Sequence, residues 1–141
     1  MHVMPQLSDA MSKSFGNDDL RLAAPALRAF TRIASAWTLT AQEQSAILGR
    51  SVDVACSQLD AGAMDSDWPE TLQRISFVLG IYAALHTLFP DQQQADGWIH
   101  RPNAGAPFKG EPALALMCTG RLGDLEIVRE YLDGQGTSQP S

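Results

Sequence analysis

The residue types that most often carry catalysis are scattered in this sequence. The three histidines, His2, His86 and His100, are far apart, and none belongs to a His-Glu-x-x-His motif. The sequence also has no Gly-x-Gly-x-x-Gly loop, phosphate loop or nucleophile elbow. His86 stands beside Tyr82 and Phe89 in an apolar stretch, where we expect a core histidine that hydrogen-bonds a neighbour. We therefore predict a protein that is not an enzyme and needs no cofactor.

The two cysteines do not indicate a metal or redox site. Cys56 and Cys118 are distant in sequence and lie outside any Cys-x-x-Cys or His/Cys cluster. We expect two buried thiols.

Residue types that are typical of protein-binding sites are concentrated between Trp98 and Gly110. This stretch combines Trp98, Phe108 and Arg101 with prolines and glycines that prevent a regular helix or strand. Aromatic and arginine side chains dominate binding hot spots. Its composition alone fits a recognition loop and a core-filling connection equally well.

A long central helix must organise the fold. The segment Ile75–Phe89 is apolar around most of a helical circumference, so other helices should surround it. Pro69 and Glu70 suit its first turn, and Pro90 marks its end. It is too short, and too often interrupted by polar residues, for the roughly 20 apolar residues of a membrane span.

Three shorter helices are predicted before it. Apolar residues at helical spacing give an amphipathic helix from Leu27 to Trp37. A Thr-x-x-Glu capping box at Thr40 opens a second helix that Gly49 closes. Ser51 can cap a third helix over residues 52–59, which Gly62 can end. The second and third helices together suggest a helix-turn-helix.

The charges of this helix-turn-helix do not favour DNA binding. Between Thr40 and Asp67 one cation faces five acids, a local charge of 1 − 5 = −4. The third helix carries Asp53 and Asp60 but no Lys or Arg, so we expect packing or dimerisation more than base readout. The residues that remain candidates for DNA contact are Arg28, Arg32, Arg50, Ser57 and Gln58.

Helices also dominate the C-terminal part. Asp91 can cap a short helix, a second should run from Pro112 to Gly120, and a last from Leu122 to Leu132 should stop at Gly134. We thus predict an all-α fold with four segments. They are a flexible segment (1–20), a helix-turn-helix region (21–68), the central helix with a small helical domain (69–134), and a flexible tail (135–141).

The net charge and the N-terminal sequence limit the kinds of partner and the cellular compartment that we expect. A net charge of −6 and a pI near 4.8 oppose non-specific binding to nucleic acid. Nothing at the N-terminus reads as a secretion signal, so we expect a cytoplasmic protein that does not contact a membrane.

Two stretches resemble the toxin-binding domain of the Xre/MbcA/ParS antitoxin family. They read ISFVLGIYAALHTLFPD and ADGWIHRPNAGAPFKGEPALALMCTGRLGDLEIVREYLDG, and the resemblance extends from about Leu72 to Gly134. Its most specific parts are Leu-Gly-Ile-Tyr-x-Ala-Leu-His from Leu79, Trp-x-x-Arg-Pro-Asn from Trp98, and Gly-Arg-Leu-x-Asp-Leu from Gly120.

The resemblance implies an antitoxin of a type II toxin-antitoxin system. Its partner would be a RES-domain toxin, which consumes NAD or ADP-ribosylates a target, and the antitoxin would cover the toxin's NAD cleft. An Xre-like helix-turn-helix would bind operator DNA and support a homodimer within the toxin-antitoxin complex. The alternative is a transcription regulator that acts mainly on promoter DNA.

The resemblance also implies which residues contact the toxin. We expect Trp98 and Phe108 to anchor the loop, and Arg101 or Asn103 to point towards the partner. The full set is Trp98, Arg101, Pro102, Asn103, Phe108, Lys109, Gly110, Arg121, Asp124, Arg129, Tyr131 and Asp133. The sequence departs from the family pattern at Glu111 and Gly123, and these changes bear on the choice of partner. It also departs in its acidic third helix, so operator binding is the family property that we least expect in this protein.

Overall fold

Residues 15–137 are described by the computed structural model of the chain. Regular structure in this range is helical, and its one extended pairing is an isolated bridge between Pro102 and Pro112. The predicted all-α class is therefore confirmed. The elements are α2 (Phe15–Ala36), α3 (Ala41–Leu48), α4 (Val52–Ala61), α5 (Trp68–Leu88), α6 (Gln92–Gly97), the 3₁₀ turn η1 (Trp98–His100), α7 (Ala113–Met117) and α8 (Leu122–Thr137).

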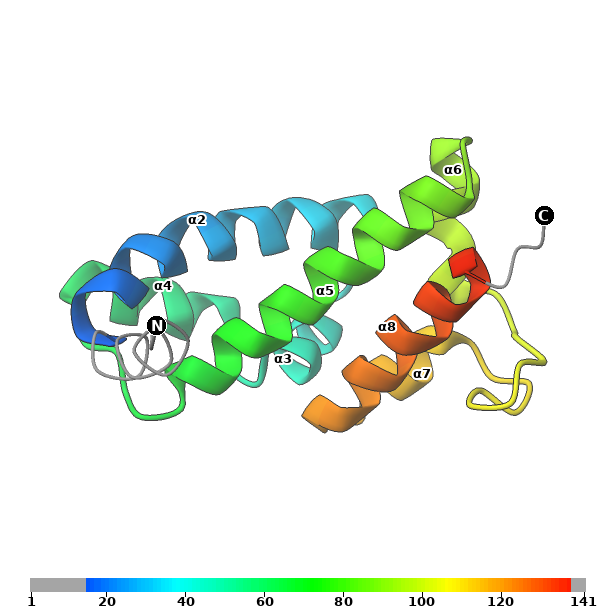
Figure 1. The fold of residues 1–141 in the computed structure, drawn as a ribbon. Helices are drawn as coiled ribbons and strands as arrows, with labels where there is room; N and C mark the ends of the chain where they lie inside the picture. The colour runs from blue at the N-terminus through cyan, green and yellow to red at the C-terminus, as the bar shows by residue number, and fades with distance from the viewer. Residues whose placement is uncertain (1–14, 138–141) are drawn as a thin grey trace, which may run out of the picture.

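Helix α5 is the central element, as predicted, and runs through the length of the molecule (Figure 1). It packs mainly against α2 and α8, and it also contacts α3 and α6. Its side chains Ile75, Val78, Ile81 and Leu85 are buried. Pro69 stands in its first turn and Pro90 lies just beyond its end, so both limits are confirmed.

Other helices do not surround α5 completely, and this part of the prediction was wrong. Leu79, on the exposed face, keeps 36% of its surface accessible. The exposed side chains between Gln73 and Thr87 recur along the length of the helix. One stripe of α5 is therefore open to a partner.

The caps predicted for α3 and α4 are present. Thr40 Oγ1 accepts the Glu43 amide at 3.1 Å, and the Glu43 carboxylate accepts the Thr40 amide at 2.9 Å. Gly49, with φ of 90°, ends α3, and Ser51 Oγ caps α4 by accepting the Val54 amide at 3.1 Å. The tight connection fixes the angle between the two helices.

The outer helices extend beyond their predicted limits. Helix α2 begins at Phe15, inside the segment 1–20 that we expected to be flexible; residues 1–14 and 138–141 lie outside the described part. Buried Ala23 continues the stripe of Leu27 by one turn, a weak signal in sequence. Helix α8 runs past Gly134, so its predicted stop was wrong. Glycine costs a helix only about 1 kcal/mol, and Gly134 is not among the glycines with positive φ.

The cysteines differ from the expectation of two buried thiols. Cys56 is exposed because α4 turns only Ala55 fully into the core. Cys118 is partly buried, and burial, with a smaller effect from the charge of Glu43, raises the pKa of its thiol to about 11. The Cys118 thiol is therefore protonated at neutral pH.

Candidate functional site

Three aromatic rings hold the segment after η1 against α8. The Phe108 ring lies 5.8 Å from Trp98 and 5.0 Å from Tyr131, edge to face in both pairs. Trp98 and Tyr131 stack at 6.2 Å. Phe108 is only 3% exposed, whereas the other two rings are partly accessible. Aromatic pairs in these geometries add stabilisation beyond their buried area, so the loop is fixed to the core.

The loop from Pro102 to Pro112 is closed by its own backbone. The Asn103 amide donates to the Glu111 carbonyl at 3.2 Å, and the Gly110 amide donates to the Asn103 carbonyl at 2.8 Å. The Asn103 side-chain oxygen accepts the Gly105 amide at 2.7 Å, which forms an Asx turn. The Asn103 side-chain oxygen is thus used inside the loop, whereas we expected Asn103 or Arg101 to point towards the partner.

The charged residues of the loop are exposed. Arg101 and Lys109 are exposed, and so is Glu111. Arg101 donates to the Gln94 carbonyl at 3.0 Å, which steadies its guanidinium against α6. Two cationic side chains are therefore presented by a loop whose backbone is fixed.

The turn into α8 is built around Asp124. Its carboxylate accepts hydrogen bonds from the Thr119 hydroxyl at 2.6 Å and from Arg121 Nε at 3.0 Å, and the side chain is 12% exposed. The Thr119 hydroxyl first, and then Arg121, hold the pKa of the Asp124 carboxyl below its ordinary value although burial opposes them. Arg121 itself is exposed. Asp124 therefore positions the turn, and Arg121 is the accessible member.

We expect Asp124→Asn to lower the free energy of unfolding by about 1–2 kcal/mol at pH 7. A carboxyl with a depressed pKa stabilises the fold above its unfolded value of about 3.9, and this contribution is lost as the pH falls through the folded value. The difference between wild type and variant should therefore shrink towards pH 2. Urea unfolding at both pH values measures it, and a difference that stays constant would contradict this role.

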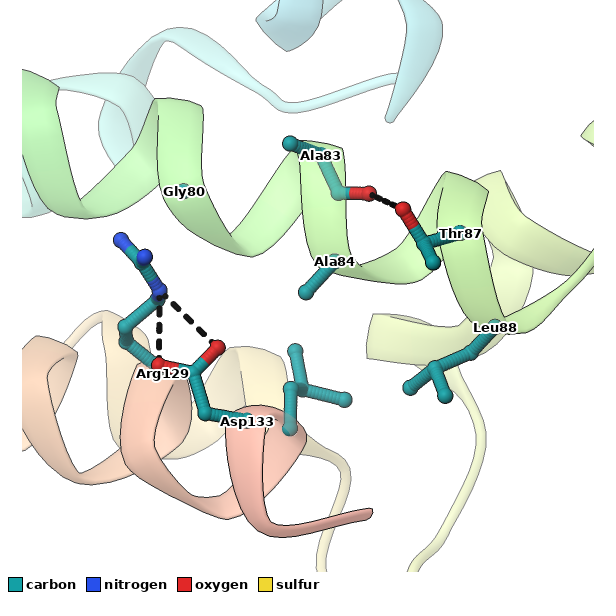
Figure 2. A pocket seen from close by; sticks show the side chains of 8 residues that line it. Gly80, Ala83, Ala84, Thr87, Leu88, Arg129 and Asp133 are labelled. Carbon is teal, nitrogen blue, oxygen red and sulfur yellow. Dashed lines mark hydrogen bonds and ion pairs between the residues drawn. The ribbon is translucent and has the colours of Figure 1, made fainter. Parts of the chain in front are cut away.

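Two further residues of the expected set, Arg129 and Asp133, line a groove between α5 and α8. Arg129 Nε approaches the Asp133 carboxylate oxygens at 3.2 and 3.3 Å. The guanidinium lies over Gly80, where a Cβ would overlap it (Figure 2). The groove has a volume of about 300 Å³ and a mostly apolar lining of small side chains from α5.

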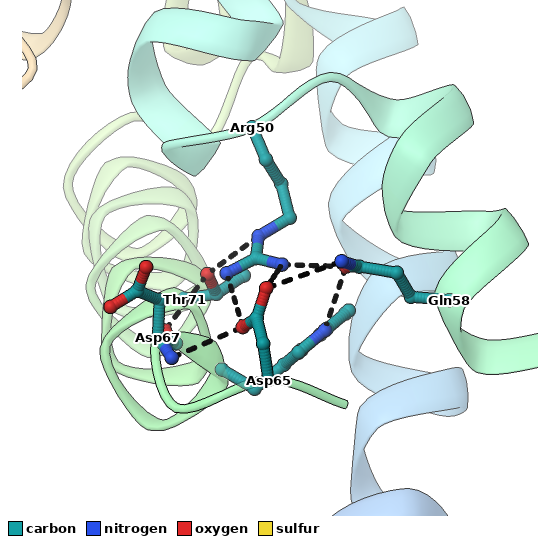
Figure 3. Close-up of polar contacts among 6 residues, drawn as sticks. Arg50, Gln58, Asp65, Asp67 and Thr71 are labelled. Atoms are coloured by element: carbon teal, nitrogen blue, oxygen red, sulfur yellow. Dashed lines mark hydrogen bonds and ion pairs between the residues drawn. The ribbon is translucent and has the colours of Figure 1, made fainter. Parts of the chain in front are cut away.

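The predicted DNA-binding residues separate into two groups. Arg28, Arg32 and Ser57 are exposed, the two arginines on α2 and the serine on α4. Arg50 and Gln58 are bound within the chain (Figure 3). The exposed side chains of α4 between Asp53 and Asp60 include no cation.

Arg50 is the centre of an internal cluster. Its guanidinium donates to Gln58 at 2.6 Å, Thr71 at 3.1 Å and Asp65 at 3.2 Å, and lies 4.9 Å from the centre of the Trp68 ring. The hydrogen bonds from Arg50 hold the pKa of Asp65 below its ordinary value. The one cation of the helix-turn-helix thus joins α4 to α5, and its donors face the protein.

Sequence reasoning missed Arg74, which lies in the middle of the core. Its guanidinium donates to the Gly120 carbonyl at 2.6 Å, to the Ile47 carbonyl at 3.3 Å and to Glu70 at 2.7 Å. The side chain is 9% exposed. Its position within an apolar helical stretch could have indicated from the sequence that this arginine is buried. Arg74 ties the end of α3 and the turn before α8 to the same point of α5.

Two histidines of the described residues have structural partners, whereas His2 lies outside the described part. His86 Nε2 lies 2.9 Å from an Asp96 carboxylate oxygen, which confirms the predicted hydrogen bond to a neighbour, but the side chain is only partly buried. His100 Nε2 lies 2.7 Å from the Trp37 carbonyl. Within residues 15–137, no group of three or more His, Cys, Asp or Glu is arranged to hold a metal, and no helix is long and apolar enough to cross a membrane.

Comparison with known proteins gives a family match for the C-terminal part of the chain. Residues 84–135 match the model of the antitoxin Xre/MbcA/ParS C-terminal toxin-binding domain. The chain is also 40% identical over 122 residues to the uncharacterized protein y4oB of Sinorhizobium fredii (strain NBRC 101917 / NGR234). This alignment covers 84% of this chain and 89% of that protein. No solved structure matches the chain. The matched range contains the closed loop, the aromatic cluster and α8.

Proposed function

Because the chain belongs to the Xre/MbcA/ParS antitoxin family, we propose that it neutralises a RES-domain toxin by covering the toxin's NAD-binding cleft. The family assignment makes it an antitoxin with a toxin as its partner. The RES identity of that toxin, a type II mechanism and the absence of catalysis in this chain are parts of the proposal.

The observation that supports steric inhibition is the rigidity of the matched region. The loop between Pro102 and Pro112 is closed by backbone hydrogen bonds, and Phe108 fixes it to α8. A surface that is ordered before binding loses little conformational entropy when it covers a cleft. Such inhibition needs shape and charge, and it needs no catalytic group.

The two exposed cations of the loop provide the test. We expect co-expression of the full chain with a RES toxin encoded beside it to restore growth. The variant Arg101→Glu/Lys109→Glu should bind the purified toxin about 10- to 100-fold more weakly, because it reverses two exposed charges without touching the core. Titration calorimetry measures the affinity.

The matched control for this double variant is Arg21→Glu/Arg32→Glu, two exposed cations on α2. It should bind the toxin as the wild type does. A wild-type chain that neither rescues growth nor binds the toxin would refute the proposed function. Equal affinities of the two double variants would refute the role of the loop.

A second candidate function is regulation of promoter DNA, including the operon's own operator. The capped α3 and α4 support it, since they retain the connection of a helix-turn-helix. The exposed acids of α4 and the internal bonds of Arg50 weigh against it. Mobility shifts on the promoter, with and without toxin, distinguish the two functions. A chain that binds the promoter alone, and tighter than unrelated DNA, would favour the regulator.

The α2–α4 surface supports the homodimer that we also propose. A groove there is lined by Leu27 and Leu59, with Arg28 from α2 and Asp60 from α4. A twofold axis would pair these opposite charges between two copies. We expect Asp60→Arg to weaken self-association and Arg28→Asp/Asp60→Arg to restore it in analytical ultracentrifugation. A monomeric wild type would refute the dimer.

A further inference from the structure

The exposed stripe of α5 is unusual for a helix on a protein surface. Between residues 73 and 87 its exposed side chains are Gln73, Ser76, Leu79, Ala83 and Thr87, none of which carries a charge. Surface helices normally place charged residues on this face. Interface cores, by contrast, are depleted in charge. The composition of this stripe is that of a surface that another molecule covers.

The stripe borders the groove between α5 and α8. Ala84 and Leu88 from α5 and Leu132 from α8 give the groove an apolar lining. The small side chain of Ala83 leaves room for close approach of a partner, whereas the Arg129 guanidinium covers Gly80 (Figure 2). The Arg129–Asp133 ion pair lies at the edge formed by α8.

The α8 edge of the groove is acidic. Glu126 and Asp133 fall on the same helical stripe as Arg129, and Glu130 is adjacent; the three acids are exposed. Arg129 already approaches Asp133 at 3.2 Å, so the edge keeps a net negative charge. A complementary partner must carry Lys or Arg beside its apolar ridge.

We propose that the groove between α5 and α8 receives an apolar segment of the toxin, flanked by basic side chains. This inference rests on the proposed function and assigns the main contact to the groove, with the loop as its neighbour. Most of the lining, from Ala84 to Asp133, falls within the matched toxin-binding range. A second copy of this chain is a poor occupant, because twofold pairing would bring the acids Glu126 and Glu130 of both copies together.

The test places a charge in the groove of the full-length chain. Ala83 and Thr87 are exposed on α5, so Ala83→Glu and Thr87→Glu should fold while placing a carboxylate where the apolar segment docks. We expect each variant to bind the purified RES toxin at least ~100-fold more weakly than wild type in titration calorimetry. The control, Ala41→Glu, adds the same charge at an exposed position in the first turn of α3 and should bind normally. Circular dichroism verifies the fold of each.

A second measurement tests the charge of the partner. Glu126→Lys/Glu130→Lys should slow association by about 10-fold and reduce its dependence on salt. If the wild type binds the toxin and both groove variants bind equally well, the groove assignment is overturned while the proposed function stands. The same holds if Ala41→Glu loses as much affinity as they do, or if the lysine variant associates faster. A wild type that does not bind the toxin overturns both.

Discussion

Replacement of Phe108 by alanine should lower the free energy of unfolding by about 3–5 kcal/mol. The ring is 3% exposed and contacts Trp98 and Tyr131 edge to face, so its loss leaves a cavity under the loop. Two aromatic contacts are lost together with the buried area. Urea unfolding followed by tryptophan fluorescence measures the change, because Trp98 reports on the same cluster.

Phe108→Leu is the matched control for this effect. It keeps most of the apolar volume and removes the ring geometry, so we expect a loss of about 1–2 kcal/mol. A loss below 1 kcal/mol for Phe108→Ala would show that the loop does not depend on this anchor. The support for a preorganised toxin-binding surface would then be removed.

The second large effect is expected at Arg74. Arg74→Met should cost about 2–4 kcal/mol, because the carbonyls of Ile47 and Gly120 lose a charged donor at a buried position. The aliphatic part of the side chain is retained, so the change isolates the polar contacts. Denaturant unfolding measures the loss.

Arg74→Lys separates charge from geometry. A lysine can keep the ion pair with Glu70, but one ammonium group cannot reproduce the planar donors that reach two distant carbonyls. We expect it to recover less than half of the loss. Full recovery by lysine would show that charge alone matters, and that Arg74 does not tie α3 to the turn before α8.

The elements with strong local signals could be predicted from the sequence. The α5 limits follow from its two prolines, and the start of α3 follows from the Thr40–Glu43 capping box. Signals of this kind act within one helical turn, so they can be read without knowledge of the tertiary packing. The stop at Gly134 failed because glycine only weakens a helix, and the packing of α8 on α5 outweighs that cost.

The site could be predicted only as a region. Arg101 and Asn103 have similar hydrogen-bonding capacity in sequence, yet the structure exposes Arg101 and uses the Asn103 oxygen for a turn. That difference depends on loop closure across Gly110 and Glu111. The roles of Arg50 and Arg74 likewise depend on partners from 8 to 46 residues away, which no local pattern contains.

The internal use of Arg50 leaves the outer face of α4 unconstrained. Asp53 and Ser57 are exposed, and the bonds that hold the helix come from Ser51 and Gln58 on its other sides. Substitutions on the outer face would therefore alter what α4 recognises at little cost to folding. The protein can therefore gain or lose DNA recognition through changes on the surface of α4 alone, while the toxin-binding domain stays unchanged.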